Sequence, residues 1–230
     1  MDSFLIDDIK FAPEIEGLLK KLHVDENTPF AEQIIRMVSE VREIARPKAF
    51  CKVCSIEKHG DNHLVIEGIE FRSHILRVNL DNVHKVFANI ATCGVELDNW
   101  SARYNDMLEK FWADTIKEQA LRKAVESVNL RVTALNASGR ISSMSPGSLE
   151  DWPITEQPRL FALLGKGAAA TGVKLTDSCL MLPTKSLSRL TFPSEHGFES
   201  CRLCPRERCP GRRAPYDPDL FARRYKPADM

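Results

Sequence analysis

Residues 106–135 decide the fold of this chain and read DMLEKFWADTIKEQALRKAVESVNLRVTAL. Apolar side chains recur in this stretch every four residues, at Trp112, Ile116, Ala120, Ala124, Val128 and Val132. Positions four apart lie on one face of an α-helix, so the spacing predicts a helix with one continuous apolar stripe. A stripe of this length indicates a central core helix on which other elements pack.

The residues before this helix predict a shorter helix and then several strands. Thr28 followed by Pro29 is a helix-start signal, because threonine caps a first turn and proline already has a helical φ. Pro47 ends that helix. Strand-like runs follow at 49–56, 64–66, 69–71 and 86–93, with a turn at 60–62. Gly94 closes the last of these runs.

The residues after the long helix change in character. Residues 137–158 are predicted to be a loop, because 142–148 are small, polar and turn-forming. A loop of this length between helices is more often functional than not. Residues 158–164 predict a short helix, and residues 173–183 and 187–192 predict two strands that pair with each other.

Composition and charge limit the classes of function. The chain has 230 residues, 43% hydrophobic and 28% charged, with a formal net charge of zero. Neutral charge argues against nucleic-acid binding driven by bulk electrostatics. No stretch approaches the roughly 20 apolar residues of a membrane helix, and the acidic N-terminus does not read as a signal peptide. We therefore expect a cytoplasmic protein with no membrane or nucleic-acid partner.

The C-terminal part holds three cysteines in C-x2-C-x4-C spacing, at Cys201, Cys204 and Cys209, with five arginines around them. Three thiols on a short polar loop are typical of a metal site, because thiolate is a soft ligand. The sequence predicts either an iron–sulfur cluster, favoured by the Cys-Pro pairs, or a zinc ion. The arginine cluster is a candidate docking patch for an acidic partner.

A fourth ligand must come from elsewhere in the chain. Cys179 is our predicted fourth ligand, and Cys51, Cys54 and His196 are the alternatives. Cys51 and Cys54 have C-x2-C spacing, but on a straight strand their side chains would point to opposite faces. Cys93, in an apolar run before Gly94, is predicted to be a buried core thiol.

Several short motifs occur in an order that resembles a known family. They are Ser145-Pro146-Gly147, Asp151-Trp152-Pro153, Glu156-Gln157, Gly172-Val173-Lys174-Leu175-Thr176 and Met181-Leu182-Pro183-Thr184-Lys185-Ser186-Leu187-Ser188. Together they resemble the activation domain of cobalamin-dependent methionine synthase, and most closely its free-standing members. The stretch 90–98 and the long helix after it also fit. The resemblance covers most of residues 30–195, and the cysteine-rich tail lies outside it.

The resemblance implies an α+β fold, in which helices pack on a curved antiparallel sheet, followed here by a small metal-binding tail. Together with the composition of the chain, it leads us to expect an N-terminal helical segment (1–47), an activation-like domain (48–195) and a Cys/Arg/Pro-rich metal-binding tail (196–230). The family domain binds S-adenosylmethionine and caps the corrin ring of a partner domain. It supports reductive remethylation of cobalamin that has been oxidised to Co(II).

The resemblance also implies a set of cofactor-binding residues. The S-adenosylmethionine loop corresponds to Ser143, Ser145, Pro146, Gly147 and Ser148, and the turn that approaches the corrin corresponds to Pro183, Lys185 and Ser186. Glu118 falls near the family's acidic residue that meets the methionine amino group.

Two positions depart from the family pattern. Ser143 stands where the family loop has an arginine, and Ser148 stands where it has a tyrosine. An arginine can clamp a carboxylate with two hydrogen bonds, and its loss removes roughly 1.5–3 kcal/mol of binding. Arg140 or an arginine of the tail is a candidate to compensate, and Phe198 is the candidate for a later aromatic near the cofactor.

The sequence supports two hypotheses of different class. In the first, the chain caps a corrinoid protein and passes an electron, received from a donor protein, through a C-terminal cluster to Co(II). S-adenosylmethionine would then be the methyl donor. In the second, the chain is a non-catalytic module that binds a corrinoid protein or methyltransferase, and its cysteines hold structural zinc. Whether the chain is itself an enzyme stays open at this stage.

Overall fold

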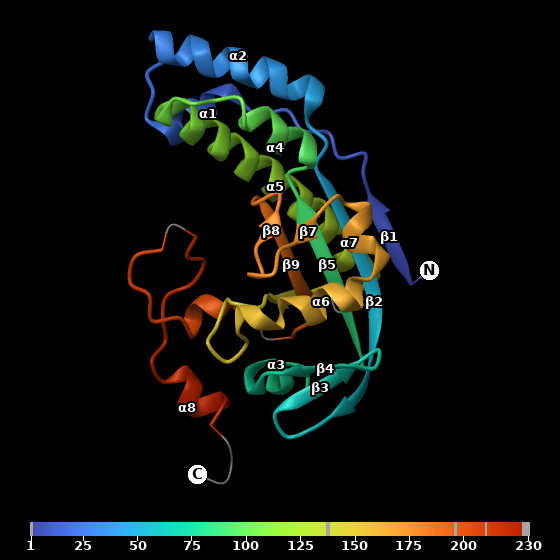
Figure 1. Ribbon diagram of the computed structural model, residues 1–230. Helices are drawn as coiled ribbons and strands as arrows, with labels where there is room; N and C mark the ends of the chain where they lie inside the picture. The colour runs from blue at the N-terminus through green and yellow to red at the C-terminus, as the bar shows by residue number, and fades with distance from the viewer. Residues whose placement is uncertain (1, 137–138, 196, 210, 227–230) are drawn as a thin grey trace.

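The computed structural model describes residues 2–136, 139–195, 197–209 and 211–226 (Figure 1). Its main sheet has seven strands in the order β4-β3-β2-β5-β9-β6, and β1 also pairs with β2. Their bounds are β1 Ser3–Ile6, β2 Lys48–His59, β3 His63–Ile66, β4 Ile69–Arg72, β5 Lys85–Thr92, β6 Ile141–Met144 and β9 Ser186–Pro193. Every pairing in this sheet is antiparallel, as predicted.

Helices cover both faces of the sheet. The longer ones are α1 Ile15–Leu22, α2 Pro29–Ile44, α5 Met107–Leu135 and α6 Gln157–Leu164. The shorter ones are α3 His74–Asn79, α4 Val95–Ser101, α7 Lys166–Ala170 and α8 Leu220–Arg224. In Figure 1 the helices α1, α2 and α4 gather at one end and α3 and α8 at the other, so the molecule has the outline of a crescent. The α+β prediction is therefore confirmed.

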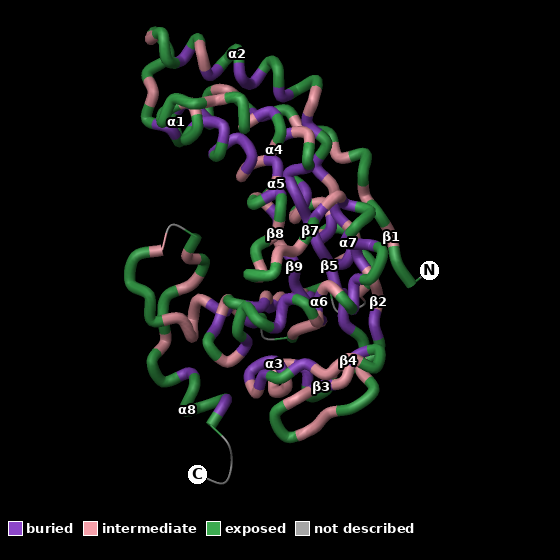
Figure 2. The backbone as a smooth tube through the Cα atoms, in the orientation of Figure 1, coloured by how far each residue is buried: buried purple, intermediate pink, exposed green. Residues whose placement is uncertain are grey.

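The long helix α5 has the predicted apolar stripe, and all six stripe residues are buried. The first half of the stripe, including Trp112 and Ile116, packs with α1, α2 and α4. The second half, including Val128 and Val132, packs against β2 and β5. Figure 2 shows this buried surface continuing from the helical end into the sheet. One helix therefore joins two separate apolar clusters.

The predicted helix starts are also present. The Thr28 hydroxyl accepts a hydrogen bond from the Ala31 amide at 3.2 Å, with Pro29 as the first residue of α2. The Asp106 carboxylate accepts hydrogen bonds from the Leu108 and Glu109 amides at 2.8 and 3.1 Å. These side chains satisfy amide groups that have no partner inside the helix.

Two predictions about the second half of the chain are wrong. Residues 141–144, predicted as loop, form strand β6 at the sheet edge, where the Ser143 hydroxyl lies 2.9 Å from the Thr191 hydroxyl of β9. Residues 173–183 do not pair with 187–192. They form a separate small hairpin of β7 (Lys174–Leu175) and β8 (Met181–Leu182), while β9 pairs with β5 and β6. The polar turn at 176–180 interrupts what periodicity alone treats as one strand.

Residues at both ends of the chain join the main body. Strand β1, within the segment predicted to be helical, extends the sheet beside β2. Near the other end, the Tyr225 side chain is fully buried and its ring packs edge-to-face on Phe198. The Tyr225 hydroxyl donates a hydrogen bond to Asn79 Oδ1 at 2.9 Å. The tail is thus anchored in the same core as the sheet.

This anchor predicts how substitutions at Tyr225 affect stability. We expect Tyr225→Ala to lower the free energy of unfolding by about 3–5 kcal/mol, because it leaves a cavity in the core. Tyr225→Phe should cost about 1 kcal/mol, since it removes only the hydrogen bond to Asn79. Urea unfolding measures both. Tyr216→Ala is the matched control, because Tyr216 is 46% exposed. If Tyr225→Ala and Tyr216→Ala had the same free energy of unfolding, the tail would not be anchored through Tyr225.

Candidate functional site

Glu118 and Lys185, which the sequence assigned to one site, lie near each other at the start of β9. Lys185 Nζ forms an ion pair with Asp114 Oδ2 at 2.8 Å, one helical turn before Glu118 on α5. Glu118 Oε1 accepts a hydrogen bond from Arg122 at 2.5 Å, and its Oε2 lies 3.5 Å from Lys21 Nζ. Both oxygens of Glu118 therefore already have cationic partners in the protein.

These partners set the charge state of Glu118. Partial burial raises its pKa, but the hydrogen bond from Arg122 and the charges of Lys21, Arg122 and Lys185 outweigh that effect. The net result is a lowered pKa. Glu118 is thus a carboxylate held in an ion-pair network, and an incoming amino group would have to displace a lysine or an arginine to reach it.

The turn from Pro183 to Ser186 is fixed against the end of β5. The Ser186 hydroxyl donates to the Pro183 carbonyl at 2.7 Å and lies 2.9 Å from Thr92 Oγ1. The Cys93 amide donates to the Lys185 carbonyl at 2.9 Å. Lys185 therefore projects from a rigid turn, with its side chain about a quarter exposed.

The loop after β6 is a compact turn. The Ser148 amide and hydroxyl both donate to the Ser145 carbonyl, at 3.1 and 2.7 Å, and Pro146 is buried. Gly147 has φ of 82°, and a Cβ there would lie 3.1 Å from Ile154 Cδ1. Only glycine fits this conformation without strain. The conformation of this loop is therefore fixed by its own hydrogen bonds and by Gly147, without a ligand.

Asp151 and Trp152 hold this loop to the body. The Trp152 ring is fully buried and packs edge-to-face on Phe71, with 6.3 Å between ring centroids. The Asp151 carboxylate accepts hydrogen bonds from the Ser73 hydroxyl and from the His74 and Ile75 amides, so it caps α3. Both residues therefore position the loop.

The predicted site residues form two groups connected by β9. The register of β6 places Ser143 opposite Thr191, and the two hydroxyl oxygens are 2.9 Å apart. Ser186 begins the same strand five residues earlier, about 16 Å away at the usual rise per residue. The Ser143–Ser148 loop follows the sheet edge, whereas Glu118 and Lys185 lie beside α5 at the start of β9.

Arg189, which the sequence analysis did not single out, lies between these two groups. Its guanidinium is 5% exposed, and it donates to Asn89 Oδ1 at 3.0 Å and to Asn129 Oδ1 at 2.5 Å. Burial lowers the pKa of Arg189 to about 10, and the nearby charge of Arg213 adds to the effect. An arginine inside a run that the sequence predicts to be a strand was the available signal.

The three tail cysteines lie on one loop, which Arg212 holds closed. The Arg212 guanidinium donates to the carbonyls of Cys201, Cys204 and Ala214 at 3.0, 3.3 and 3.2 Å. Within the described residues, however, no three His, Cys, Asp or Glu side chains converge as metal ligands would. The thiols have suitable donor chemistry, but the described arrangement does not fit a metal site.

Cys179 is half-buried in the turn between β7 and β8, with φ of 63°, and so is not in mid-strand as we expected. His196, an alternative ligand, lies outside the described residues. Phe198, the candidate cofactor aromatic, is buried in the core, where its amide donates to the Ser142 hydroxyl at 2.6 Å.

The other three cysteines are buried, as the sequence predicted for Cys93. Cys51 and Cys54 point to opposite faces of β2, Cys51 toward α5 and Cys54 toward α6. Burial raises the thiol pKa to about 12 for Cys51, about 11 for Cys54 and about 12 for Cys93. Neutral thiols on opposite faces of one strand cannot bind one metal ion together.

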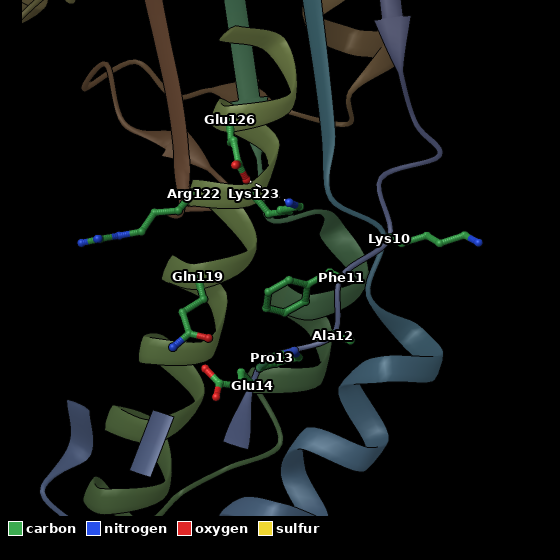
Figure 3. Close-up of a pocket in the computed structure, with 9 residues that line it drawn as sticks. All are labelled: Lys10, Phe11, Ala12, Pro13, Glu14, Gln119, Arg122, Lys123 and Glu126. Carbon is green, nitrogen blue, oxygen red and sulfur yellow. Dashed lines mark hydrogen bonds and ion pairs between the residues drawn. The ribbon is translucent and has the colours of Figure 1, made fainter. Parts of the chain in front are cut away.

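A surface pocket of about 470 Å³ lies between α5 and the segment Lys10–Glu14 (Figure 3). Arg122, the partner of Glu118, lines it, but the Ser143–Ser148 loop does not. Figure 3 shows Lys10 and Arg122 pointing away from each other, with the Phe11 ring between the segment and α5. Because Lys10 and Arg122 point in different directions, they cannot bind one anionic group together. We therefore do not assign the functional site to this pocket.

The fold is similar to that of a solved reactivation domain. The chain is similar to a solved structure of the MetH reactivation domain bound to AdoHcy, with a TM-score of 0.58 and 15% sequence identity. The match covers 84% of this chain and 78% of the other. At the level of the fold, it confirms the resemblance read from the sequence. No family model matches the chain, and no curated protein matches it.

No helix among the described residues is both long enough and apolar enough to cross a membrane.

The cysteine environments predict a sharp division in thiol reactivity. In the reduced native protein, iodoacetamide should modify Cys179, Cys201, Cys204 and Cys209, because all four are partly exposed. The buried thiols of Cys51, Cys54 and Cys93 should react only after denaturation, because their raised pKa values leave almost no thiolate. Peptide mass spectrometry identifies each modified residue. Equal labelling of all seven native thiols would contradict the burial described here.

Proposed function

We propose that this protein acts in the reactivation of a corrinoid protein, capping the exposed face of the corrinoid with the concave side of the crescent. The observation that carries the proposal is a set of exposed apolar side chains beside Lys185, on a fold shared with a reactivation domain. A soluble monomer seldom leaves large apolar side chains grouped on its surface unless they bind something.

The apolar surface comes from α5 and from the β7–β8 hairpin, which protrudes on the concave side (Figure 1). On α5, Met107 and Phe111 are 83% and 57% exposed, and their spacing places them on the same helix face as Asp114. On the hairpin, Leu180 and Leu182 are 50% and 42% exposed. The ion pair between Lys185 and Asp114 connects the two parts. We call this set of residues the apolar rim.

The apolar rim suits the face of a corrin, which is a broad, largely apolar ring with polar amide groups at its edge. The four apolar side chains would cover the ring, and Lys185 would meet an amide oxygen or phosphate at its edge. Since burying apolar area contributes roughly 25 cal/mol per Å², a modest contact area would suffice for a transient complex.

An S-adenosyl ligand is the second part of the proposal. Its support is the similar structure, which holds AdoHcy, together with the rigid turn of Ser145, Pro146, Gly147 and Ser148 along the sheet edge. The turn presents backbone and hydroxyl groups that can position such a ligand. The ion pairs of Glu118 argue against a direct role for that carboxylate in binding the methionine amino group.

Electron delivery by the cysteine tail is the third part, and it rests on sequence spacing. The described tail does not bring three ligands together, so a cluster or a zinc ion would require Cys201, Cys204 and Cys209 to turn inward. An electron donor protein is a predicted partner only if the metal proves to be a redox cluster.

The apolar rim can be tested with the cobalamin-binding domain of a methionine synthase as the probe, in its Co(II) form. We expect Leu182→Glu to weaken the complex at least roughly tenfold, because a carboxylate would be buried against the ring. Leu135→Glu is the matched control: Leu135 is 57% exposed but lies at the far end of α5. Titration calorimetry gives both affinities. Equal binding by both variants would remove the rim from the proposal, and no binding by the unmodified protein would contradict the capping function.

Metal analysis and a visible spectrum of protein purified without oxygen would show whether the tail cysteines hold an iron–sulfur cluster or a zinc ion. About four irons per chain, with absorbance near roughly 400 nm that bleaches with dithionite, would support electron delivery. Cys204→Ser should then lose iron, while Cys93→Ser, which changes a buried thiol, should keep it. One zinc without colour would favour the non-catalytic binding module. Full iron retained in Cys204→Ser would rule out the tail as the cluster site.

A further inference from the structure

The tail is the basic part of a chain that is otherwise acidic. Residues 199–226 hold eight arginine and lysine side chains and four aspartate and glutamate side chains, a formal net charge of +4. Since the whole chain has a net charge of zero, the other residues together carry −4. A neutral molecule whose charges are separated in this way still has a positive field around one part of its surface.

Most arginines of the tail have partners within the tail. Arg202 and Arg223 both form ion pairs with Asp217, at 3.1 and 2.7 Å. Arg213 forms an ion pair with Glu199 at 2.9 Å. These side chains therefore stabilise the fold of the tail, and the arginine cluster that the sequence offered as a docking patch is smaller than its composition suggests.

Arg206 and Arg208 differ from these arginines. Both are exposed, and over the described residues neither side chain makes an ion pair or a hydrogen bond. Glu207, between them, is also exposed and pairs with neither of them in the described part of the tail. Two arginines and one carboxylate therefore project into solvent side by side, with an excess of one positive charge.

Arg212 fixes the loop that carries these two arginines, residues 201–209, which we call the tail loop. Its guanidinium donates to the carbonyls of Cys201 and Cys204 at 3.0 and 3.3 Å, and also to the carbonyl of Arg206. Carbonyl groups carry no formal charge, so the charge of Arg212 adds to that of the tail loop. A loop held in this way loses less conformational entropy when a partner binds to it.

The tail loop faces the space that the proposed partner would occupy. In Figure 1 it lies on the open side of the crescent, the side on which the β7–β8 hairpin protrudes. Tyr216, 46% exposed, lies beside it, because the amide of the next residue, Asp217, donates to the Arg202 carbonyl at 2.9 Å. Arginine and aromatic side chains are enriched in protein interfaces, so this composition favours a protein partner.

We propose that the tail loop is a docking surface for an acidic patch on the protein that carries the corrinoid. Arg206 and Arg208 meet this patch while the apolar rim covers the ring, so the inference rests on the proposed function. Charges at the edge of an interface act mainly on the rate of association and on the orientation of the complex. A nucleic acid fits less well, because it is negative along its whole length and the rest of the chain, with a net charge of −4, repels it.

Association kinetics with the cobalamin-binding domain of a methionine synthase, in its Co(II) form, test this docking surface. For Arg206→Glu/Arg208→Glu we expect the association rate constant to fall roughly tenfold at low ionic strength, with little change in dissociation. The matched control is Arg36→Glu/Arg42→Glu, which makes the same change in net charge at two exposed positions of α2. It should associate within roughly twofold of the unmodified protein.

Ionic strength separates electrostatic docking from a change in structure. The difference between the two double variants should shrink as salt is added, because the Debye length falls from about 30 Å at 0.01 M to about 8 Å at 0.15 M. Equal association rates for the two double variants would overturn the proposal, and so would a difference that salt does not reduce. If the glutamate variant melts at a lower temperature, Arg206→Gln/Arg208→Gln decides, with an expected loss of roughly threefold.

If the unmodified protein does not bind the cobalamin-binding domain, the capping function fails, and the tail loop is judged on its own. A fluorescent poly-L-glutamate and a DNA duplex of equal charge are then compared by anisotropy. Binding of poly-L-glutamate that is lost in Arg206→Glu/Arg208→Glu and kept in the control upholds a docking surface for an acidic protein of another kind. No binding of poly-L-glutamate, tighter binding of the DNA, or an equal loss in both double variants overturns it.

Discussion

The burial of the α5 stripe is the constraint on which the rest of the structure depends. A helix 29 residues long is about 44 Å from end to end, longer than a single small core can cover. Its first half is covered by α1, α2 and α4, and its second half by the sheet. The crescent follows from this division, because two apolar clusters must form side by side along one axis.

The same helix contacts both groups of candidate site residues along β9. The Asp114 and Glu118 positions meet the start of β9 through Lys185, and Asn129 meets the middle of β9 through Arg189. The apolar rim and the Arg189 position are therefore held on rigid elements rather than on free loops. A corrinoid cap and a small ligand would be positioned relative to each other by one helix and one strand.

The sequence predicted most of the elements, because their signals are local. The stripe of α5, the cap at Thr28 and the runs of β2 to β5 depend on neighbours a few residues apart. The secondary-structure predictions were wrong where the pairing of strands distant in the sequence determines the structure. Residues 141–144 look like loop in isolation but pair with β9, and residues 173–183 contain a turn that periodicity does not reveal. The predicted ligand Cys179 lies in that turn.

The central helix, the turn at Gly147 and the burial of Cys93 were predictable from residue type and short-range spacing, and the fold class was predictable from the family resemblance. Only the tertiary structure decided that Glu118 is already ion-paired and that Trp152 is an anchor. It also decided that Arg189, which no motif marks, is a buried cation that donates hydrogen bonds to the neutral side chains of Asn89 and Asn129. The physical reason is that burial and electrostatic compensation depend on side chains distant in the sequence: Asn89, Asn129 and Arg213 meet Arg189 only when the chain is folded.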